Sequence, residues 1–424
     1  MKVLWLCNVA LPQISKKLSL TPSPYGGWLE GAANAILEQP DIELTVCYPQ
    51  EIRGEMLRNR LDRIESFGFA AGGKSLYVYD EGVKAQFSRI LAECRPDVIH
   101  VWGTEYPHSL AMMEACREAG LLERTLLYIQ GLVGVYARHF LSAVPPVVAR
   151  RHTLRDFIKR GSVRQQAHMF AQRGKYEARA LSLARHIIGR TDWDRACVER
   201  INREAHYHVC NETLRGEFYR HRWSIDQCQR HSIFVSQSDY PIKGFHLMLE
   251  AMRDIVRRYP DAQLFTTGSN PLDAKFPFGR MRQTYYRRYL GKLLEEYGLR
   301  GHVTFLGTLG EREMCAQYLK AHVFASCSSI ENSSNSVGEA MVLGVPVVAS
   351  DVGGVASMLT HNLEGFMYPF DEPYMLAYDV MRLFGDDALA LSFSGNANKR
   401  AGVTHDPQQN ARMLMGIYLD AAGR

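Results

Sequence analysis

The sequence lacks the features of disulfide-rich, membrane-spanning and nucleic-acid-binding proteins. Its nine cysteines are scattered and never have the CxxC spacing, so we expect reduced thiols rather than a disulfide framework. No apolar run reaches the roughly 18 residues that a transmembrane helix needs. The formal net charge is only +5 over 424 residues, and no nucleic-acid partner is expected.

The first residues, MKVLWLCNVALP, are expected to form a strand rather than a signal peptide. Lys2 supplies the only basic charge, Asn8 interrupts the apolar run, and no small-residue cleavage site follows. We therefore expect a cytoplasmic protein.

Short, nearly all-apolar segments alternate with helical segments along the whole chain. Such segments predict parallel strands in sheets that helices cover on both faces. Ten segments have this character: KVLWLC, IELTVCY, PDVIHVW, TLLYIQG and HIIGRT in the first half, and HSIFVSQ, AQLFTTG, HVTFLG, AHVFASC and VPVVAS in the second. The fold class is therefore α/β, with two Rossmann-like domains. We expect a first domain over residues 1–224, a second over 225–405, and a helix over 406–424 that crosses back to the first.

Residues 328–354, SSIENSSNSVGEAMVLGVPVVASDVGG, place two glutamates around a run of small polar residues. A predicted strand precedes them, and a helix is expected from about Ser336 to Leu343, with Gly344 ending it. Ligands of open parallel sheets bind where strands lead into helices, because N–H groups at helix starts attract anions. Small residues there let a phosphate approach the backbone.

The two acids, Glu331 and Glu339, fit sugar hydroxyls. An ionised carboxylate only accepts hydrogen bonds, and a vicinal diol offers two donors. Glu339 would hold the ribose of a nucleotide, and Glu331 would face a second sugar beyond the diphosphate. The pattern thus predicts a nucleotide-sugar site; the alternative is that both glutamates are exposed charges at a helix end.

The sequence resembles the retaining glycosyltransferases of family 4, which have the GT-B fold, two Rossmann-like domains with parallel sheets facing across a cleft. The Glu331-x7-Glu339 pair, followed by AMVLGVPVVASDVGG, matches the family's acid pair, its Gly-x-Pro-Val strand and its double glycine, Gly353 and Gly354. Four further segments occur in the family's order: SPYGGW, GRTDWDRA, YPIKGFHLMLEAM and VTFLG. The resemblance implies a hexosyltransferase that uses a nucleotide sugar and needs no metal or other cofactor.

The resemblance also implies individual donor contacts. Lys243 would stabilise the charge that builds on the leaving diphosphate, and Gly26 and Gly27 would let backbone approach the same phosphates. As alternatives, the lysine is an ordinary loop residue and the glycines only shape a turn. The remaining implied donor contacts are Gly307, Leu309, Glu331, Asn335, Ser336 and Glu339.

Two positions depart from the family pattern. Gln237 stands where the family usually has an arginine, so one phosphate-binding charge is missing; Arg190 and Arg282 are candidates to replace it. Gln130 stands where the family often has a histidine. A glutamine cannot act as a base, although it is able to hydrogen-bond the transferred sugar or the acceptor. A transfer in which the leaving phosphate receives the acceptor proton needs no base.

Other groups are weaker candidates. Glu105 and His108 follow a predicted strand at its carboxyl end and are candidate acceptor contacts, with ordinary loop residues as the alternative. His206, His208 and Cys210 occupy alternate positions of a predicted strand. Their side chains would share one face and could together ligate zinc. Because no fourth ligand is evident in the sequence, packing is the favoured interpretation.

Residues 138–185 carry many more basic than acidic side chains. Mixed with apolar stretches, such a segment is suited to peripheral contact with an anionic membrane at the inner face of the plasma membrane, which would fit a lipid-linked acceptor. A solvated helical face, or a wall that attracts phosphates, is equally compatible with it.

The function that the sequence predicts is retaining transfer of a hexose from a nucleotide sugar, UDP-linked in preference to GDP-linked, to a hydroxyl of a glycan or lipid-linked glycan. Surface polysaccharide biosynthesis is the setting that the resemblance implies. Two alternatives stay open. One is a nucleotide-sugar epimerase of the same fold, which would need an acid–base pair in the first domain, where Gln130 speaks against one. The other is a nucleotide-sugar-binding protein that has lost catalysis.

Overall fold

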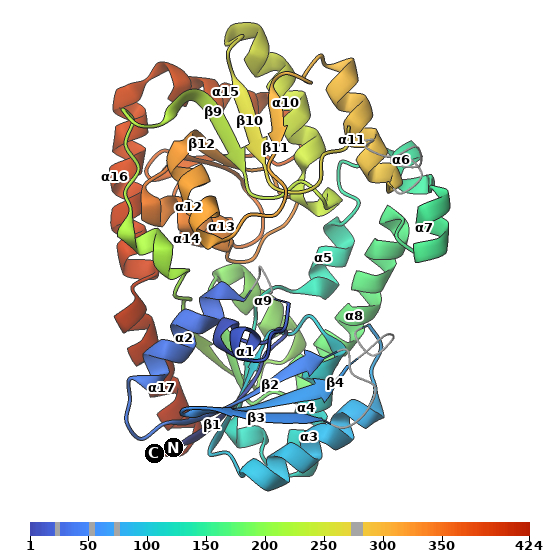
Figure 1. Cartoon of the computed structure of the whole chain (residues 1–424), viewed down its shortest axis with the longest axis vertical. Coiled ribbons are helices and arrows are strands. Elements are labelled where there is room, and N and C mark those ends of the chain that lie inside the picture. Colours follow the sequence, from blue (N-terminus) through green and yellow to red (C-terminus); the bar gives the residue numbers. More distant parts are fainter. Residues whose placement is uncertain (22–25, 51–55, 72–76, 273–282) are drawn as a thin grey trace. The chain divides into compact units, whose positions relative to one another are not determined.

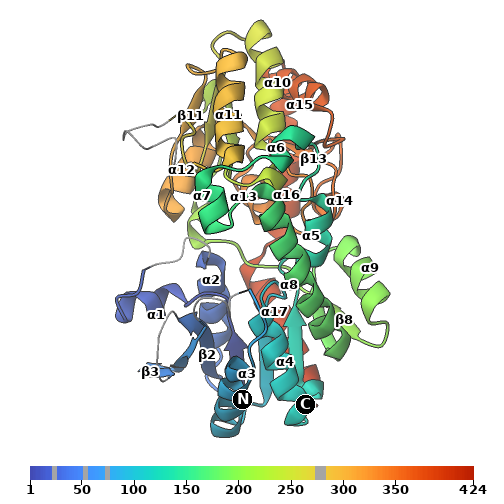
Figure 2. The same cartoon turned by 90° about the vertical axis from the view of Figure 1, so that its right-hand side faces the viewer.

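The computed structural model describes residues 1–21, 26–50, 56–71, 77–272 and 283–424. Its contacts divide the chain into two units. Unit 1 consists of Met1–Val135, Phe170–Arg215 and His405–Arg424, and unit 2 of Tyr136–Met169 and Gly216–Thr404. Figures 1 and 2 show the helices and strands from two sides.

Unit 1 is built on an eight-stranded sheet with the order β3-β4-β2-β1-β5-β6-β7-β8. All neighbouring strands are parallel except β3 and β4, which are antiparallel. The strands are β1 (Lys2–Leu6), β2 (Glu43–Gln50), β3 (Leu57–Leu61), β4 (Ile64–Ala70), β5 (Val98–Trp102), β6 (Thr125–Tyr128), β7 (His186–Gly189) and β8 (His206–Val209). The helices are α1 (Pro12–Lys17), α2 (Gly27–Leu37), α3 (Glu81–Cys94), α4 (Pro107–Glu118), most of α8 (Val163–Leu183), α9 (Asp192–Ile201) and α17 (Pro407–Ala421).

The first strand shows why the strands of this sheet are apolar throughout. Leu4 and Leu6 join one core, and Val3 and Trp5 join a second core on the opposite side. Successive side chains of a strand point to opposite faces, so a sheet with two covered faces needs apolar residues at every position. The second core includes Tyr418 of α17, which ties the end of the chain to the first strand.

Unit 2 is built on six parallel strands with the order β11-β10-β9-β12-β13-β14. The strands are β9 (Gln229–Val235), β10 (Gln263–Thr266), β11 (Val303–Phe305), β12 (Ala321–Ser326), β13 (Val347–Ser350) and β14 (Gly365–Tyr368). Its helices are α6 (Pro146–Arg150), α7 (Leu154–Lys159), α10 (Phe245–Arg258), α11 (Tyr285–Glu296), α12 (Glu311–Lys320), α13 (Asn335–Leu343), α14 (Val355–Met358), α15 (Pro373–Gly385) and α16 (Asp387–Thr404). Helix α5 (Val133–His139) spans the boundary between the units. Among the described helices, none combines the length and the apolar character needed to cross a membrane.

The predicted fold class is confirmed: each of the ten predicted strand segments contains a strand, and both sheets are mainly parallel. The helix expected from about Ser336 runs over Asn335–Leu343, and Gly344 ends it in the left-handed conformation with a φ of 79°. Four strands did not enter the prediction as strand segments: β3, β4, β8 and β14. Strand β3, LRNRL, is polar and lies at the sheet edge, so it lacks the apolar signal.

The division into units differs from the expected 1–224, 225–405 and 406–424. Residues 136–169 cluster with unit 2, since Thr153 Oγ1 donates to the Gln283 carbonyl at 2.9 Å. The boundary also lies before residue 225, because Trp223 donates its backbone N–H to Leu343 at 2.8 Å. The last helix, α17, clusters with unit 1.

Candidate functional site

The two glutamates that sequence analysis singled out lie in unit 2 and are buried. Glu331 is on the loop after β12 and is 7% exposed, and Glu339 is on α13 and is 6% exposed. They are therefore not exposed charges at a helix end. A buried carboxylate needs a partner, because burying an unpaired charge costs several kcal/mol.

Lys243 supplies the partner for Glu331. Its Nζ lies 2.5 Å from Glu331 Oε1, and Ser328 Oγ donates to the same oxygen at 2.6 Å. Lys243 ends the short 3-10 turn Pro241–Lys243, between β9 and α10. The prediction assigned Lys243 and Glu331 to separate parts of a ligand; the structure pairs their side chains directly. The carboxylate is thereby neutralised beside the start of α13, where an anion is favoured.

Two glycines allow the loops of Lys243 and Glu331 to lie against other main chain. Gly244 has a φ of 66°, and a Cβ on it would lie 1.8 Å from the Cys327 carbonyl oxygen. Gly353 has a φ of 55°, and a Cβ there would lie 1.9 Å from the Glu331 carbonyl oxygen. Gly354 donates its N–H to that same oxygen at 3.0 Å. Only glycine fits such positions, which explains physically Gly244 and the first residue of the double glycine, Gly353.

The other expected donor residues of unit 2 lie near the carboxyl ends of its strands. Asn335 and Ser336 form the first turn of α13, and the Ser336 carbonyl accepts from Tyr318 Oη at 3.0 Å. Gln237 follows β9 and is half-buried. The last two, Gly307 and Leu309, follow β11; Gly307 has a φ of 72°. Because the strands are parallel, their carboxyl ends meet at one edge of the sheet.

Sequence analysis missed Tyr136 and His139, which belong to the α5 part of unit 2. Tyr136 Oη accepts the backbone N–H of Asn332 at 3.0 Å, and Ser329 Oγ donates to the His139 carbonyl at 3.0 Å. These bonds hold the loop that carries Glu331. No local sequence signal relates these residues, which are 190 or more positions apart.

Unit 1 contains the remaining expected residues. Gly27 begins α2 and Gly26 is its N-cap residue; residues 23–25 of the same segment lie outside the described residues. Gln130 Nε2 donates to Glu212, and Arg190 pairs with the other oxygen of Glu212 at 2.6 Å. Arg190 also donates to the Gln130 carbonyl at 3.3 Å.

The pairing with Glu212 concerns Arg190 as a candidate replacement for the arginine that the family has at the position of Gln237. The side chains of Arg190 and Glu212 are both 2% exposed, so the charge of Arg190 is compensated within unit 1. The other candidate, Arg282, lies outside the described residues. Glu212, which sequence analysis did not select, is the residue that orients the Gln130 amide.

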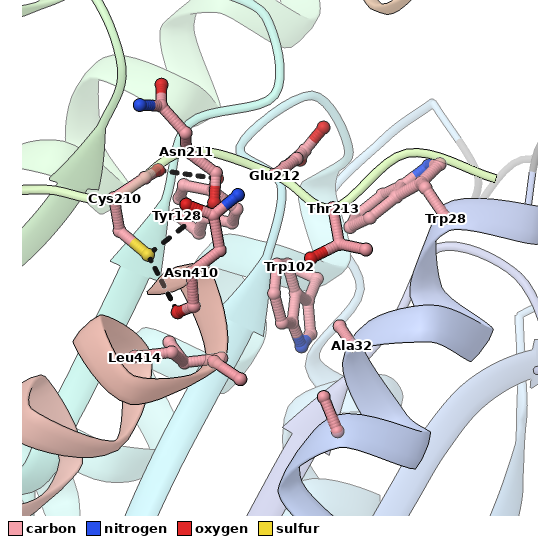
Figure 3. A pocket seen from close by; sticks show the side chains of 12 residues that line it. Trp28, Ala32, Trp102, Tyr128, Cys210, Asn211, Glu212, Thr213, Asn410 and Leu414 are labelled. Atoms are coloured by element: carbon pink, nitrogen blue, oxygen red, sulfur yellow. Dashed lines mark hydrogen bonds between the residues drawn. The ribbon is translucent and has the colours of Figure 1, made fainter. Parts of the chain in front are cut away.

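A pocket of unit 1 lies next to this cluster (Figure 3). Its walls combine aromatic rings with amide, hydroxyl and carboxylate groups, as small-molecule sites commonly do. The lining residues are Trp28, Ala32, Ala35, Trp102, Tyr128, Cys210, Asn211, Glu212, Thr213, Asn410, Ala411 and Leu414. Trp28 directly follows the two glycines at the start of α2.

Glu105 and His108 lie close together at the carboxyl end of β5, joined by Asn8. Asn8 Nδ2 donates to Glu105 at 3.3 Å, and His108 Nε2 donates to Asn8 Oδ1 at 2.8 Å. Burial raises the pKa of the Glu105 carboxyl and, with the nearby Arg173 charge, lowers the pKa of His108 to about 3. The imidazole is therefore neutral at pH 7. Asn8 was seen in the sequence only as an interruption of an apolar run.

Residues 217–400 match the family described as Glycosyl transferases group 1, which is nearly all of the Gly216–Thr404 segment of unit 2. Among curated proteins, the phosphatidyl-myo-inositol mannosyltransferase of Mycolicibacterium smegmatis is 26% identical over 193 residues, 45% of this chain and 45% of that protein. The chain thus matches about half the length of such relatives. The domain match and the named relatives support a glycosyltransferase enzyme.

Solved structures resemble the whole chain. Sucrose-phosphate synthase from Thermosynechococcus elongatus has a TM-score of 0.71 at 16% sequence identity. The superposition covers 99% of this chain and 98% of the synthase chain. The Anabaena protein HepE in complex with UDP-glucose has a TM-score of 0.67 at 15% identity, over 98% of this chain and 100% of that one. The chain has the GT-B fold, in common with these structures.

The close approach at Gly353 predicts a specific stability defect. Gly353→Ala would place a Cβ against the Glu331 carbonyl and force a strained φ, so we expect a loss of about 1–3 kcal/mol, visible as a lower thermal midpoint. Gly395→Ala is the matched control, because its Cβ meets nothing within 4 Å and it lies inside α16. Equal thermal midpoints for the two variants would contradict the assigned contact.

Proposed function

We propose that the protein is a retaining glycosyltransferase that moves a hexose from a nucleotide sugar to a hydroxyl of a glycan or lipid-linked glycan. The observation that carries the proposal is the buried Lys243–Glu331 pair beside the start of α13, inside the segment that matches the glycosyltransferase family. A UDP-sugar is favoured over a GDP-sugar, in keeping with the UDP-glucose complex of the structurally similar HepE protein.

The donor site combines three kinds of group with distinct roles. The first N–H groups of α13 have no carbonyl within the helix to bind and would donate to the diphosphate. Lys243 would stabilise the charge that develops on the leaving phosphate, a contribution that grows as the bond breaks. Glu339 would accept from the ribose hydroxyls, and Glu331 from the hydroxyls of the transferred sugar.

The reaction balances without a protein base. The bond between the anomeric carbon and the diphosphate oxygen breaks, and a bond to the acceptor oxygen forms on the same face of the sugar. The acceptor proton passes to the leaving phosphate oxygen. Gln130, whose amide is held by Glu212, fits a positioning contact rather than proton transfer. No metal step is part of the proposed reaction.

We assign the acceptor to unit 1. The pocket shown in Figure 3 has a volume of only about 20 Å³, which is too small to enclose a sugar ring. The candidate acceptor contacts are therefore the side chains of Glu105 and His108, which Asn8 joins at the carboxyl end of β5. The proposed setting is the assembly of a surface polysaccharide by a cytoplasmic enzyme.

A labelled-donor assay separates the proposal from its alternatives. A transferase hydrolyses UDP-glucose slowly, or glycosylates an added acceptor, and releases UDP. An epimerase of the same fold interconverts the sugar while the nucleotide stays attached, and a binding protein leaves the donor unchanged. Release of UDP supports the proposal; either of the other two results overturns it.

Substitution of Glu339 and substitution of Glu331 should produce different defects. Glu339→Ala should weaken nucleotide affinity by about 1–3 kcal/mol through lost ribose bonds, whereas Glu331→Ala should chiefly slow turnover. Isothermal titration with UDP and steady-state kinetics measure the two effects. Glu364→Ala is the control, because Glu364 is also 6% exposed and pairs with Arg400 away from this loop. If Glu339→Ala bound UDP as tightly as the Glu364 variant, the ribose contact would be wrong.

We further propose that residues 146–160, part of the basic segment, contact an anionic membrane. Helices α6 and α7 expose four large apolar side chains, at 55–69%: Val147, Leu154, Phe157 and Ile158. Four exposed basic residues lie at the carboxyl ends of the same two helices or directly after them: Arg150, Arg151, Lys159 and Arg160. Apolar side chains among cations match a bilayer surface rich in anionic lipids, which would suit a lipid-linked acceptor.

Hydrogen bonds within unit 2 fix the position of α7. Asp156 is fully buried, accepts the N–H of Thr153 at 3.0 Å and accepts the N–H of Tyr285 at 2.8 Å. The inner side of α7 is thus anchored to the start of α11, and its apolar residues point away from that anchor into solvent. An amphipathic surface held rigidly loses little entropy on contact with a membrane.

Vesicle cosedimentation tests this contact. The protein should bind vesicles that contain phosphatidylglycerol more strongly than pure phosphatidylcholine vesicles. The double change Phe157→Ser and Ile158→Ser should reduce binding at least about tenfold, since each buried side chain contributes about 1.5–3 kcal/mol. The control Leu391→Ser removes a residue that is 50% exposed on α16. Equal binding by the two variants would contradict the proposed surface.

A further inference from the structure

A cluster of metal-binding side chains lies in unit 1, outside the candidate donor site. It consists of three histidines and one aspartate: His186, His206, His208 and Asp420. One ligand atom from each residue lies within 4.8 Å of the others. The histidines come from β7 and β8 at the edge of the sheet, and the aspartate comes from α17 at the end of the chain.

Strand register explains why the three imidazoles meet. His206 and His208 are two positions apart on β8 and share one face of the sheet. His186 is the register partner of His206 on β7, so its side chain lies on the same face. Ile188, two residues along β7, packs in the core that contains residues of α17, which identifies this face as the one that α17 covers.

The distances between the rings are close to those of a metal site. His186 Nδ1 lies 3.0 Å from His208 Nε2, and the ring centroids of His206 and His208 are 4.6 Å apart. A tetrahedral zinc site with bonds of about 2.0–2.1 Å sets its ligand atoms about 3.3–3.4 Å apart. Small side-chain adjustments therefore bring the four ligand atoms to zinc distances without moving the strands.

We propose that His186, His206, His208 and Asp420 form a structural zinc site that fastens α17 to the edge of the unit 1 sheet. Three imidazole nitrogens and one carboxylate oxygen complete a tetrahedral set, which zinc prefers over the octahedral oxygen sites of magnesium and calcium.

Cys210 is not part of this site, although its spacing to the two β8 histidines suggested one. Its Sγ lies 3.9 Å from the Asn410 carbonyl in the buried core, and it does not belong to the group of ligand atoms that lie within 4.8 Å of one another. The fourth ligand instead comes from Asp420, which is 212 positions beyond His208 in the sequence and next to it only in the folded unit.

The zinc would reinforce the attachment of α17 to the sheet of unit 1, which hydrogen bonds already support. Tyr418, two residues before Asp420, accepts a hydrogen bond from Trp5 Nε1 at 2.9 Å and bonds His100 Nδ1 at 2.6 Å. A metal bound to Asp420 and to two strands would add a second attachment to the same last turn of α17. Metal binding then adds to the stability of unit 1, because a preformed site exists only in the folded state.

Metal titration of the full-length, tag-free protein, first treated with a chelator, tests the site. We expect one equivalent of Zn²⁺ to bind, a visible absorption band typical of tetrahedral cobalt on adding Co²⁺, and a higher thermal midpoint with zinc. His208→Ala and Asp420→Asn should each lower zinc affinity at least about tenfold and abolish the thermal shift. His152→Ala, which removes an exposed histidine of unit 2, is the control and should leave both unchanged.

Asp420→Asn keeps the size of the side chain and tests the carboxylate without a packing change. Circular dichroism and UDP binding show whether the metal-free variants are folded. Zinc binding that persists unchanged in both ligand variants, or the lack of a stoichiometric zinc site in the parent protein, would overturn the proposal.

Discussion

The pairing of Lys243 with Glu331 is the interaction on which the candidate donor site depends. It brings together the loop after β9 and the loop after β12, and it neutralises a carboxylate that burial would otherwise penalise. The main chain can adopt this arrangement only because Gly244 and Gly353 have positive φ values and no side chain. The acid, its cation and the start of α13 therefore form one unit of structure, and each part constrains the position of the others.

Patterns that repeat locally predicted the fold well. The ten apolar strand segments are all strands, because a strand buried on both faces is apolar at every position whatever its partners. Gly344 marked the end of α13 because a left-handed residue there needs no side chain. Strand β3 escaped prediction because it is an edge strand with polar residues. The assignment of residues 136–169 to unit 2 depends on contacts such as that between Thr153 and Gln283, which no local pattern contains.

In the candidate sites too, sequence analysis identified local motifs but not contacts between residues far apart in the sequence. Glu331, Glu339 and Lys243 carry recognisable motifs, so sequence analysis selected them, but it did not foresee that Lys243 would pair with Glu331. Glu212 and Asp420 carry no motif; their roles arise from neighbours far away in the sequence. Chemistry at a strand end is readable from a sequence, whereas a partner supplied by another element becomes visible only in the fold.

The most direct test of the donor site is hydrogen–deuterium exchange of the backbone amides with and without saturating UDP. We expect slower exchange in residues 241–245 and 328–339, because the N–H groups there would bind the diphosphate or belong to the loops that close around it. Residues of α16 on the same unit should exchange equally in both samples. Protection by UDP that is confined to other segments, with none in residues 328–339, would contradict the assignment of the donor site to the start of α13.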